Sequence, residues 1–380
     1  MSISVFQQVL KQIPRRQFQS IVARHEGDKW VKSFSCWQQL VAMIYAQLSG
    51  QTSLRDLEAS FNAAPQRHYQ LGGGPIKRST LSEANAKRPL AIFEELLRLL
   101  LARLDARLAR EAEDALRILD STVISLSAKS HRWAAFRVNN AAIKLHLVFD
   151  PDAQCPTFFE VAPARLHDQT LAWQVPIEPK ASYVFDRAYM DAGFWAKLHE
   201  AGCRFVTRAK SNLLLEILQS RIDPTDCIFQ DDIVRLEGQG KDKYPKPLRR
   251  IVYYDEERAK ELTFLTNDMQ SPASDIAALY KRRWQIELFF KWIKQNLELK
   301  RFMAKNPKAV RLQIITALIA FVALKLLHHS IATTTPLKRL KALCKNNLFN
   351  QNEIYTLINP KPPKPPNPTA HQLLMNFPGQ

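Results

Sequence analysis

The sequence contains few residues of the kinds that make tight turns or crosslinks. Only 10 of its 380 residues are glycine, and no glycine-rich phosphate-binding loop is present, which disfavours a metabolic enzyme that binds nucleotides in this way. The five cysteines are an odd number and include no Cys-x-x-Cys pair. This argues against both a disulfide framework and a zinc site, and it is typical of a reducing compartment.

Acidic residues are also scarce. The chain has 54 Lys plus Arg against 36 Asp plus Glu, a net charge of +18. Residues 281–380 hold 17 of these cations and 3 acidic residues, which leaves +14 of the +18 in this last segment. Such a field attracts a phosphate backbone and predicts salt-sensitive binding to nucleic acid. A membrane surface or an acidic protein could be attracted by the same charge, but neither explains the carboxylates described below.

No apolar run is continuous enough to suggest a membrane span. The most apolar stretch, residues 312–327, contains Gln313, Thr316 and Lys325, whereas a transmembrane helix needs about 20 mostly apolar residues. We therefore expect a buried core helix and no membrane partner. The N-terminus lacks a basic-then-apolar signal pattern, so we expect a cytoplasmic protein, associated with the bacterial nucleoid if DNA is its partner.

Charged and aromatic residues are concentrated between positions 280 and 294. At about 100° per residue on an α-helix, one stripe contains Tyr280, Arg283, Glu287, Lys291 and Lys294. A separate apolar stripe can anchor the helix in a core. A lone carboxylate among cations suits a metal ion held beside phosphates. From this helix alone, a solvated face with ion pairs four residues apart explains the pattern equally well.

Two aspartates upstream interrupt or end apolar, strand-like runs. Asp120 lies inside residues 116–126, which are rich in Ile, Leu and Val, and Asp186 ends the run that begins at residue 182. A carboxylate within a buried strand is costly unless something neutralises it, although Asp186 could simply cap the helical stretch that follows. With Glu287 they make a set of three oxygen ligands suited to Mg²⁺, and a pair of such ions can drive an in-line phosphoryl displacement.

These motifs resemble a known family. Leu-Asp-Ser-Thr at Asp120, Val-Phe-Asp-Arg-Ala-Tyr at Asp186 and Tyr280-x2-Arg283-x3-Glu287-x6-Lys294 resemble the DDE transposases of bacterial insertion sequences, in the branch with the Tyr-Arg-Glu-Lys signature. The resemblance is close over residues 115–300. It implies that Asp120, Asp186 and Glu287 are catalytic and hold two Mg²⁺ ions, which Mn²⁺ can replace.

The same resemblance implies that Tyr280, Arg283 and Lys294 contact DNA phosphates near the scissile bond. Lys291 lies on the same stripe but outside the signature, so it is a weaker candidate for a DNA contact. Trp284 could stack on a displaced base, or it could occupy a core position.

The order of predicted elements gives the fold class. Strands at residues 116–126, 143–150 and 157–161, a helix at 168–173 and a strand ending at Asp186 follow the ribonuclease-H-like order, in a mixed α/β sheet with helices. A helix at about 190–201 and a strand at 204–207 come next. Asp186 lies 66 residues after Asp120 and 101 residues before Glu287. The second interval is too long for a simple core, and alternating runs within it predict a β-rich insertion at 210–270.

We therefore divide the chain into a helical domain at residues 1–110, a catalytic core at 115–209 and 271–330, the insertion at 210–270, and a basic region with a Pro-rich tail at 331–380. Within residues 30–90 we expect a helix-turn-helix-like module that binds the ends of the element, or else a helical cap with a polar face. The insertion either helps to form or hold a DNA hairpin, as in relatives, or has no catalytic role. The tail is expected to be extended or disordered.

The predicted function is cut-and-paste transposition of an insertion sequence. The resemblance implies metal-dependent strand cleavage at the element ends and strand transfer to target DNA. The implied partners are double-stranded DNA, as terminal inverted repeats and as target, and a second copy of the chain in a homodimer on DNA. The alternatives are a catalytically inactive DNA-binding relative and a nuclease that cuts without joining.

Overall fold

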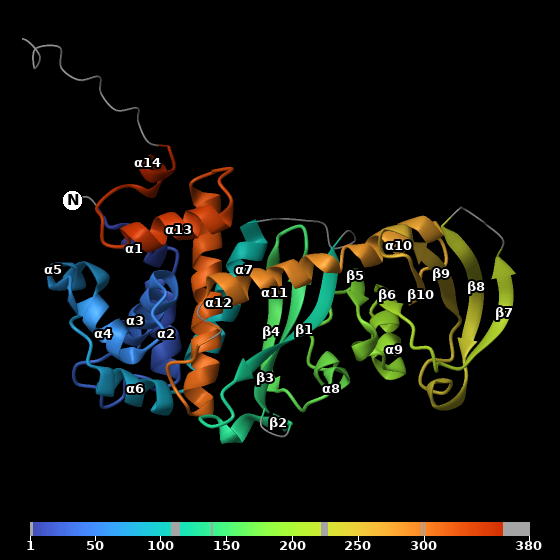
Figure 1. The fold of residues 1–380 in the computed structure, drawn as a ribbon, viewed down its shortest axis with the longest axis horizontal. Coiled ribbons are helices and arrows are strands. Elements are labelled where there is room, and N and C mark those ends of the chain that lie inside the picture. Colours follow the sequence, from blue (N-terminus) through green and yellow to red (C-terminus); the bar gives the residue numbers. More distant parts are fainter. Residues whose placement is uncertain are drawn as a thin grey trace, which may run out of the picture.

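The protein is a mixed α/β structure that is elongated along one axis. The computed structural model describes residues 3–107, 115–137, 140–221, 227–297, 299 and 301–359. Helices from the first part of the chain gather at one end, and the last four strands of the sheet lie at the other (Figure 1). The Pro-rich segment from residue 360 onward, for which an extended or disordered tail was predicted, lies outside the described residues.

The first hundred residues are helical, as the sequence predicts. Ser35 and Gln38 form a capping box at the start of α3, and Ser53 caps α4 by accepting a hydrogen bond from the Asp56 N–H, so two orphan helix ends are satisfied locally. The helices are α1 (Val5–Leu10), α2 (Arg15–Arg24), α3 (Cys36–Ser49), α4 (Leu54–Asn62), α5 (Pro65–His68), α6 (Arg78–Lys87) and α7 (Ala91–Arg107).

Helices from the C-terminal part of the chain complete this helical unit. They are α12 (Pro307–Ser330), α13 (Leu337–Asn347) and α14 (Ile354–Ile358). The long helix α12 packs against α3 and α7, and α13 packs against α1 and α3. The backbone N–H groups of Val5 and Phe6 donate to the carbonyls of Asn350 (3.0 Å) and Leu348 (2.8 Å). Both ends of the chain therefore build one helical unit.

Helix α12 is the one helix in the described part of the chain that is long and apolar enough to cross a membrane by length and composition. However, 89% of its most apolar window is buried inside the structure. Its neighbours α3 and α7 cover it from the N-terminal side of the molecule. The prediction of a buried core helix is confirmed.

Ten strands form one sheet among the described residues. Its order is β2-β3-β1-β5-β6-β10-β9-β8-β7, with β4 paired to β3. Strand β1 is antiparallel to β3 and parallel to β5, and β5 is parallel to β6. The central strands are β1 (Leu116–Leu126), β2 (Ala135–Arg137), β3 (Asn140–Asp150), β4 (Cys155–Pro163), β5 (Ser182–Phe185) and β6 (Arg204–Arg208). Every strand predicted here from the sequence is present, and β2 is additional.

The predicted insertion contributes the remaining strands, β7 (Leu215–Arg221), β8 (Ile228–Leu236), β9 (Leu248–Asp255) and β10 (Lys260–Thr266). Three alternating runs predicted β8, β9 and β10. No sequence pattern predicted β7, because this edge strand is exposed along most of its length and lacks an alternating pattern. Strand β10 pairs antiparallel with β6, so the four strands extend the central sheet.

Separate apolar cores cover the sheet. One face packs with the helical unit and with α11 (Trp284–Asn296), using Ile118, Leu145 and Val184. The other core contains Phe194 and Trp195 of α9 (Ala192–Glu200), close to α8 (Asp168–Ala172). Helix α11 crosses the sheet between α10 (Ala273–Lys281) and α12 (Figure 1). This position places side chains of α11 beside those of β1, where the candidate site lies.

The segment from Tyr280 to Lys294 differs from the predicted single helix. It breaks at Arg282 and Arg283, between α10 and α11. The Arg283 N–H bonds to the Tyr280 carbonyl, three residues back, which tightens the turn. Its side chain is held by Asp120 of β1 and by Glu287. The break thus coincides with a tertiary ion pair, and Tyr280 belongs to a different helix from Glu287.

Candidate active site

Asp120 and Asp186 lie side by side at the sheet. In the parallel pairing of β1 with β5, Leu119 is opposite Phe185, so the next residue on each strand is an aspartate. Asp186 ends β5 and caps the short 3₁₀ turn Arg187–Tyr189 by accepting the Arg187 N–H at 2.7 Å. The capping role considered for Asp186 is therefore real, and it coexists with its place beside Asp120.

Arg283 connects Asp120 to Glu287, which lies in the first turn of α11. Its Nη1 is 2.7 Å from Asp120 Oδ2, and its Nη2 is 2.6 Å from Glu287 Oε1. The Arg283 and Asp120 side chains are each 17% exposed, so these bonds form largely away from water. Such charge-assisted bonds are stronger than neutral ones. The three residues form one connected unit across two elements that are far apart in sequence.

The environment of Asp120 disfavours its negative charge. Burial raises the pKa of Asp120 to about 6, and the nearby Asp186 and Glu287 carboxylates act in the same direction. The Arg283 guanidinium and the Ser121 N–H oppose this rise. Asp120 is thus close enough to the other two acids to be repelled by them. The positive charge of Arg283 does not fully offset this repulsion and the burial of Asp120. A site of this kind gains from additional positive charge.

A cleft of about 600 Å³ opens above these carboxylates. It is lined by the three acids and by Arg283, Lys291 and Lys294, together with Ser121, Thr122, Phe290 and Gln295. Lys294 Nζ is 2.5 Å from Thr122 Oγ1 and 2.9 Å from the Val123 carbonyl, which ties the far end of α11 to β1. Burial lowers the pKa of Lys294. Six of the predicted site residues therefore meet in one cleft.

The other two predicted site residues lie outside the lining of this cleft. Tyr280 is buried, with its ring 4.6 Å from that of Phe264 and the Arg283 guanidinium 5.8 Å from its centroid. Trp284 is 47% exposed, and the Arg258 guanidinium lies 5.4 Å from its ring. Trp284 is thus not a core residue, whereas Tyr280 packs in the core beneath Arg283. Their contacts with DNA stay a prediction.

Sequence reasoning missed a polar group beside the cleft. Ser121 Oγ donates to Asp168 Oδ1 at 2.8 Å, and the buried His146 lies 3.4 Å from the same oxygen. Lys144 also pairs with Asp168, at 3.2 Å. The dipeptide Ser-Thr directly after Asp120 was a usable signal, because both hydroxyls follow the carboxylate along β1. Lys144 and His146 lie two residues apart on β3 and Asp168 begins α8, so no single sequence motif contains all three.

The carboxylates fit a hard divalent cation by chemistry, since oxygen ligands are what Mg²⁺ and Mn²⁺ prefer. Within the described residues, however, no three carboxylate, imidazole or thiol groups converge closely enough to hold a metal ion. Asp120 and Glu287 both point to Arg283 instead. Arg283 supplies the positive charge here, through one oxygen of each carboxylate.

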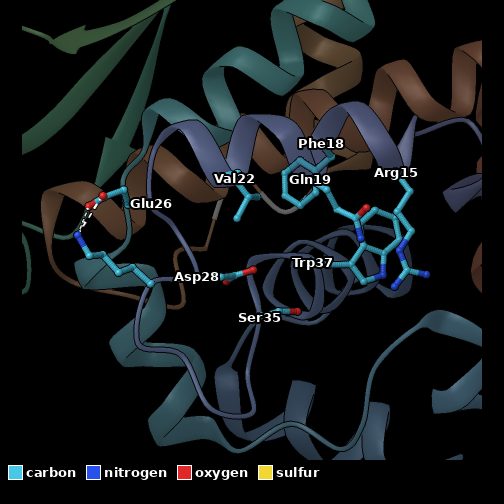
Figure 2. A pocket seen from close by; sticks show the side chains of 10 residues that line it. Arg15, Phe18, Gln19, Val22, Glu26, Asp28, Ser35 and Trp37 are labelled. Carbon is cyan, nitrogen blue, oxygen red and sulfur yellow. Dashed lines mark hydrogen bonds and ion pairs between the residues drawn. The ribbon is translucent and has the colours of Figure 1, made fainter.

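A second hollow, of about 530 Å³, lies in the helical unit between α2 and the start of α3. Figure 2 shows Arg15 beside Trp37 and an ion pair that joins Glu26 to Lys29. The other acid there, Asp28, accepts the Cys36 N–H at 2.6 Å. Each carboxylate in this hollow therefore has a structural partner, and the arrangement offers no pair of acids for catalysis.

Residues 111–323 match the family model described as transposase DDE domain, and residues 1–73 match a domain of unknown function, DUF4372. A protein of Sinorhizobium fredii that carries the transposase name y4zB is 39% identical over 302 residues, which cover 77% of this chain and 84% of that protein. A protein of Geobacillus stearothermophilus, named as a transposase for insertion sequence element IS5377, is 28% identical and covers 70% of this chain and 68% of its own length.

Among solved structures, the piggyBac transposase synaptic complex with hairpin DNA is similar with a TM-score of 0.48 and 11% identity. The match covers 94% of this chain and 81% of that one. This likeness is too distant to carry any inference about the chain.

Proposed function

The chain belongs to the DDE transposase family, and from this premise we propose that it moves an insertion sequence by a cut-and-paste reaction. A transposase of this family cleaves DNA and transfers the cut strand. The observation that carries the assignment of the site is the cleft in which Asp120 and Asp186 occupy neighbouring strand positions and Arg283 joins Asp120 to Glu287.

The strand order supports a ribonuclease-H-like core. Strands β4, β3, β1, β5 and β6 are adjacent in that order, with β3 antiparallel to its neighbour and the last three parallel. In such a core the first acid lies on the first strand, and the second ends the strand beside it. Asp120 and Asp186 have these places, and a later helix over the sheet brings Glu287.

We assign Asp120, Asp186 and Glu287 as the ligands of two Mg²⁺ ions. When bound, the metal ions supply an activated hydroxyl nucleophile and stabilise the leaving oxygen of a phosphodiester. The raised pKa of Asp120 supports this assignment, because a carboxylate short of positive charge gains most from a cation. The family uses divalent ions in general. The number of ions and the identity of the ligands are our proposal.

The residues around the acids position DNA. Arg283 is poised to exchange one of its carboxylate partners for a phosphate oxygen, which a guanidinium binds in the same fork geometry. Lys291 and Lys294 line the same cleft and add positive charge along α11. We assign Arg283, with Tyr280 packed beneath it, and Lys294 to the Tyr-Arg-Glu-Lys signature. Their task is to hold the scissile phosphate, so that positioning and charge neutralisation supply most of the rate.

The remaining predictions concern the partners of this site. We propose that α3 to α6 bind the terminal inverted repeats, and that strands β7 to β10 help to form or hold a hairpin. We also propose that a homodimer forms on DNA, since each element end needs an active site. The net charge of +18 supports binding of the protein to duplex DNA, whose phosphates attract Lys and Arg side chains.

Strand joining with a labelled element end tests this function. The wild type with Mg²⁺ is expected to cut the end and join it to a target plasmid. Glu287→Gln keeps the shape of the side chain and removes its charge, so joining is expected to fall at least about 100-fold. Glu200→Gln, on the exposed side of α9, is the matched control and is expected to join normally.

Joined product from Glu287→Gln at the wild-type level would show that the active site lies elsewhere. Cleavage without joining by the wild type would favour the nuclease-only alternative. Binding of the end without cleavage would favour the catalytically inactive one.

A further inference from the structure

A third cavity, of about 540 Å³, lies among α11, α12 and the start of α13, and is lined by other residues of α11 than the catalytic cleft. We name it the lysine cavity after Lys325 and Lys338, which line it. Aromatic and aliphatic side chains form its other walls, with Trp292 and Leu288 on α11 and Leu337 on α13. None of the residues that line it is acidic.

Lys325 is an unusual residue for its position. It lies in α12, whose other residues from Val310 to Leu327, apart from Arg311, are buried. In the described part of the chain it has no ion pair or hydrogen bond, and burial lowers its pKa. Lys325 itself is partly buried, and a partly desolvated ammonium with no anion beside it is costly. Its presence on the wall of an open cavity indicates that an anion completes its environment.

No acidic residue of the surrounding sequence or of the cavity lining neutralises Lys325. The Cys155 thiol interacts with it, but burial raises the pKa of this thiol to about 12, so it stays uncharged. Residues 301–352 include nine lysines and arginines and no acidic residue. Lys338, at the mouth of the cavity, is exposed and, in the part of the chain that the structure covers, makes no ion pair. The anion must therefore come from another molecule, and its charge must match two lysines.

The walls indicate what accompanies the anion. Trp292 is half-buried and braced edge-on by Phe321, with ring centroids 5.3 Å apart. Leu288, one turn earlier on α11, is 49% exposed. A rigid indole beside a lysine pair offers a stacking surface next to a phosphate site, which is the combination that binds single-stranded nucleic acid.

The position of the cavity fits a DNA strand that leaves the active site. Helix α11 presents Glu287 to the catalytic cleft and Trp292 to the lysine cavity. A helix with side chains is about 10 Å wide, a distance that about three nucleotides span at roughly 3.4 Å each. A strand held at the carboxylates can therefore reach the cavity without a change of fold.

Resting on the proposed function, we propose that the lysine cavity binds one unpaired nucleotide of the DNA strand flanking the cut, with its phosphate on Lys325 and Lys338 and its base on Trp292. An acidic peptide could use the lysines but not the stacking surface, and it has no reason to lie beside the cleft. The cavity would thus hold the flank away from the carboxylates while the end reacts.

Binding of element-end DNA with a duplex flank or a four-nucleotide unpaired flank tests the proposal. The wild type is expected to prefer the unpaired flank by at least about fivefold, the low end of the gain from stacking one base. Lys325→Met and Lys338→Met are each expected to abolish this preference and to lower the slope of log affinity against log salt by about 0.7, the value for one phosphate on a single strand. Binding of the duplex flank should be unchanged.

Photocrosslinking locates the contact directly. With 5-iodouracil in the unpaired flank, the main adduct is expected at Trp292 in the wild type and should be lost in Lys325→Met. Lys197→Met, at an exposed position of α9, is the control and should retain the preference and the adduct. The melting temperature of Lys325→Met should equal or exceed that of the wild type, because the variant removes a desolvated charge.

Adducts elsewhere, an unchanged flank preference in both lysine variants, or a lower melting temperature of Lys325→Met would each overturn the proposal. These outcomes leave the proposed function intact if the wild type still cuts and joins ends. If the wild type binds the unpaired flank as expected but neither cuts nor joins, the proposed function fails and the lysine cavity stands. Absence of any binding to end DNA would overturn both.

Discussion

Arg283 has the largest structural role of any single cation in the cleft. It satisfies Asp120 and Glu287 together, at 2.7 and 2.6 Å. Arg283→Gln leaves two adjacent carboxylates without compensation, so we expect a loss of about 2–4 kcal/mol in the free energy of unfolding without metal. Urea denaturation measures it.

The neighbouring Arg282 provides the control for this prediction. Arg282 pairs with Asp152, and both side chains are more than a third exposed. Surface pairs of this kind contribute little, so Arg282→Gln is expected to cost less than about 1 kcal/mol. Equal losses for the two variants would mean that the ion pairs across the cleft carry no special stability.

His146 makes stability depend on pH. It is 4% exposed, and burial lowers its pKa, with Lys144 acting in the same direction and Asp168 opposing. Tyr189 also faces it, with the hydroxyl 3.1 Å from Nδ1. The folded protein therefore holds the neutral ring. The corresponding stability is present above the unfolded pKa of about 6.5 and is lost as the pH falls toward the lower folded value.

Denaturation between pH 7.5 and pH 5 checks this prediction. The wild type should lose stability relative to His146→Gln over this range, since glutamine does not titrate. Asp120, whose raised pKa acts in the opposite direction, is present in both proteins, so its effect cancels in the comparison. Parallel losses in both proteins would assign the pH dependence to other groups.

At the scale of elements, α12 anchors the segment that follows the catalytic helix. Gln313 is buried, its side-chain carbonyl accepts the Met303 N–H at 3.0 Å, and its amide donates to the Arg301 carbonyl at 2.9 Å. Gln313→Leu keeps the size of the side chain but leaves the Met303 N–H and the Arg301 carbonyl without this hydrogen-bond partner. We therefore expect the free energy of unfolding to fall by about 1–3 kcal/mol. Thermal unfolding followed by circular dichroism measures it, and an unchanged midpoint would refute the anchoring role.

The elements also show how far sequence patterns reach. Strand β1 and helix α12 were predictable because long apolar runs are decided by burial, which the sequence records directly. The carboxylates were predictable because Asp120 interrupts such a run and Glu287 lies in a signature. The break between α10 and α11 was not, because it occurs where Arg283 contacts Asp120, 163 positions away, and no local pattern records that contact. Strand β7 was missed for the opposite reason, since an exposed edge strand needs no apolar alternation.

At the scale of the whole molecule, the two ends of the chain depend on each other. Phe349 stacks on Tyr45 with ring centroids 5.3 Å apart and packs against Phe6 at 6.4 Å. Removal of residues 331–380 exposes this surface and deletes Leu340 and Leu348, both buried. At about 1.5–3 kcal/mol for each large apolar side chain, the truncation is expected to cost at least about 3 kcal/mol.

Thermal unfolding of the truncated protein tests this interdependence. Removal of residues 360–380 alone is the control, because it leaves each of these contacts in place. A stable, cooperatively unfolding protein after removal of residues 331–380 would show that the helical unit does not need its C-terminal part.

The most direct test of the central claim is cleavage of a supercoiled plasmid that carries the element's own ends, in Mg²⁺, by the wild type and by Glu287→Gln. We predict that the wild type cuts at the ends, and that the variant binds them with the same affinity but does not cut. Equal cutting by both proteins would contradict the account, because the acids joined through Arg283 would then not be the active site.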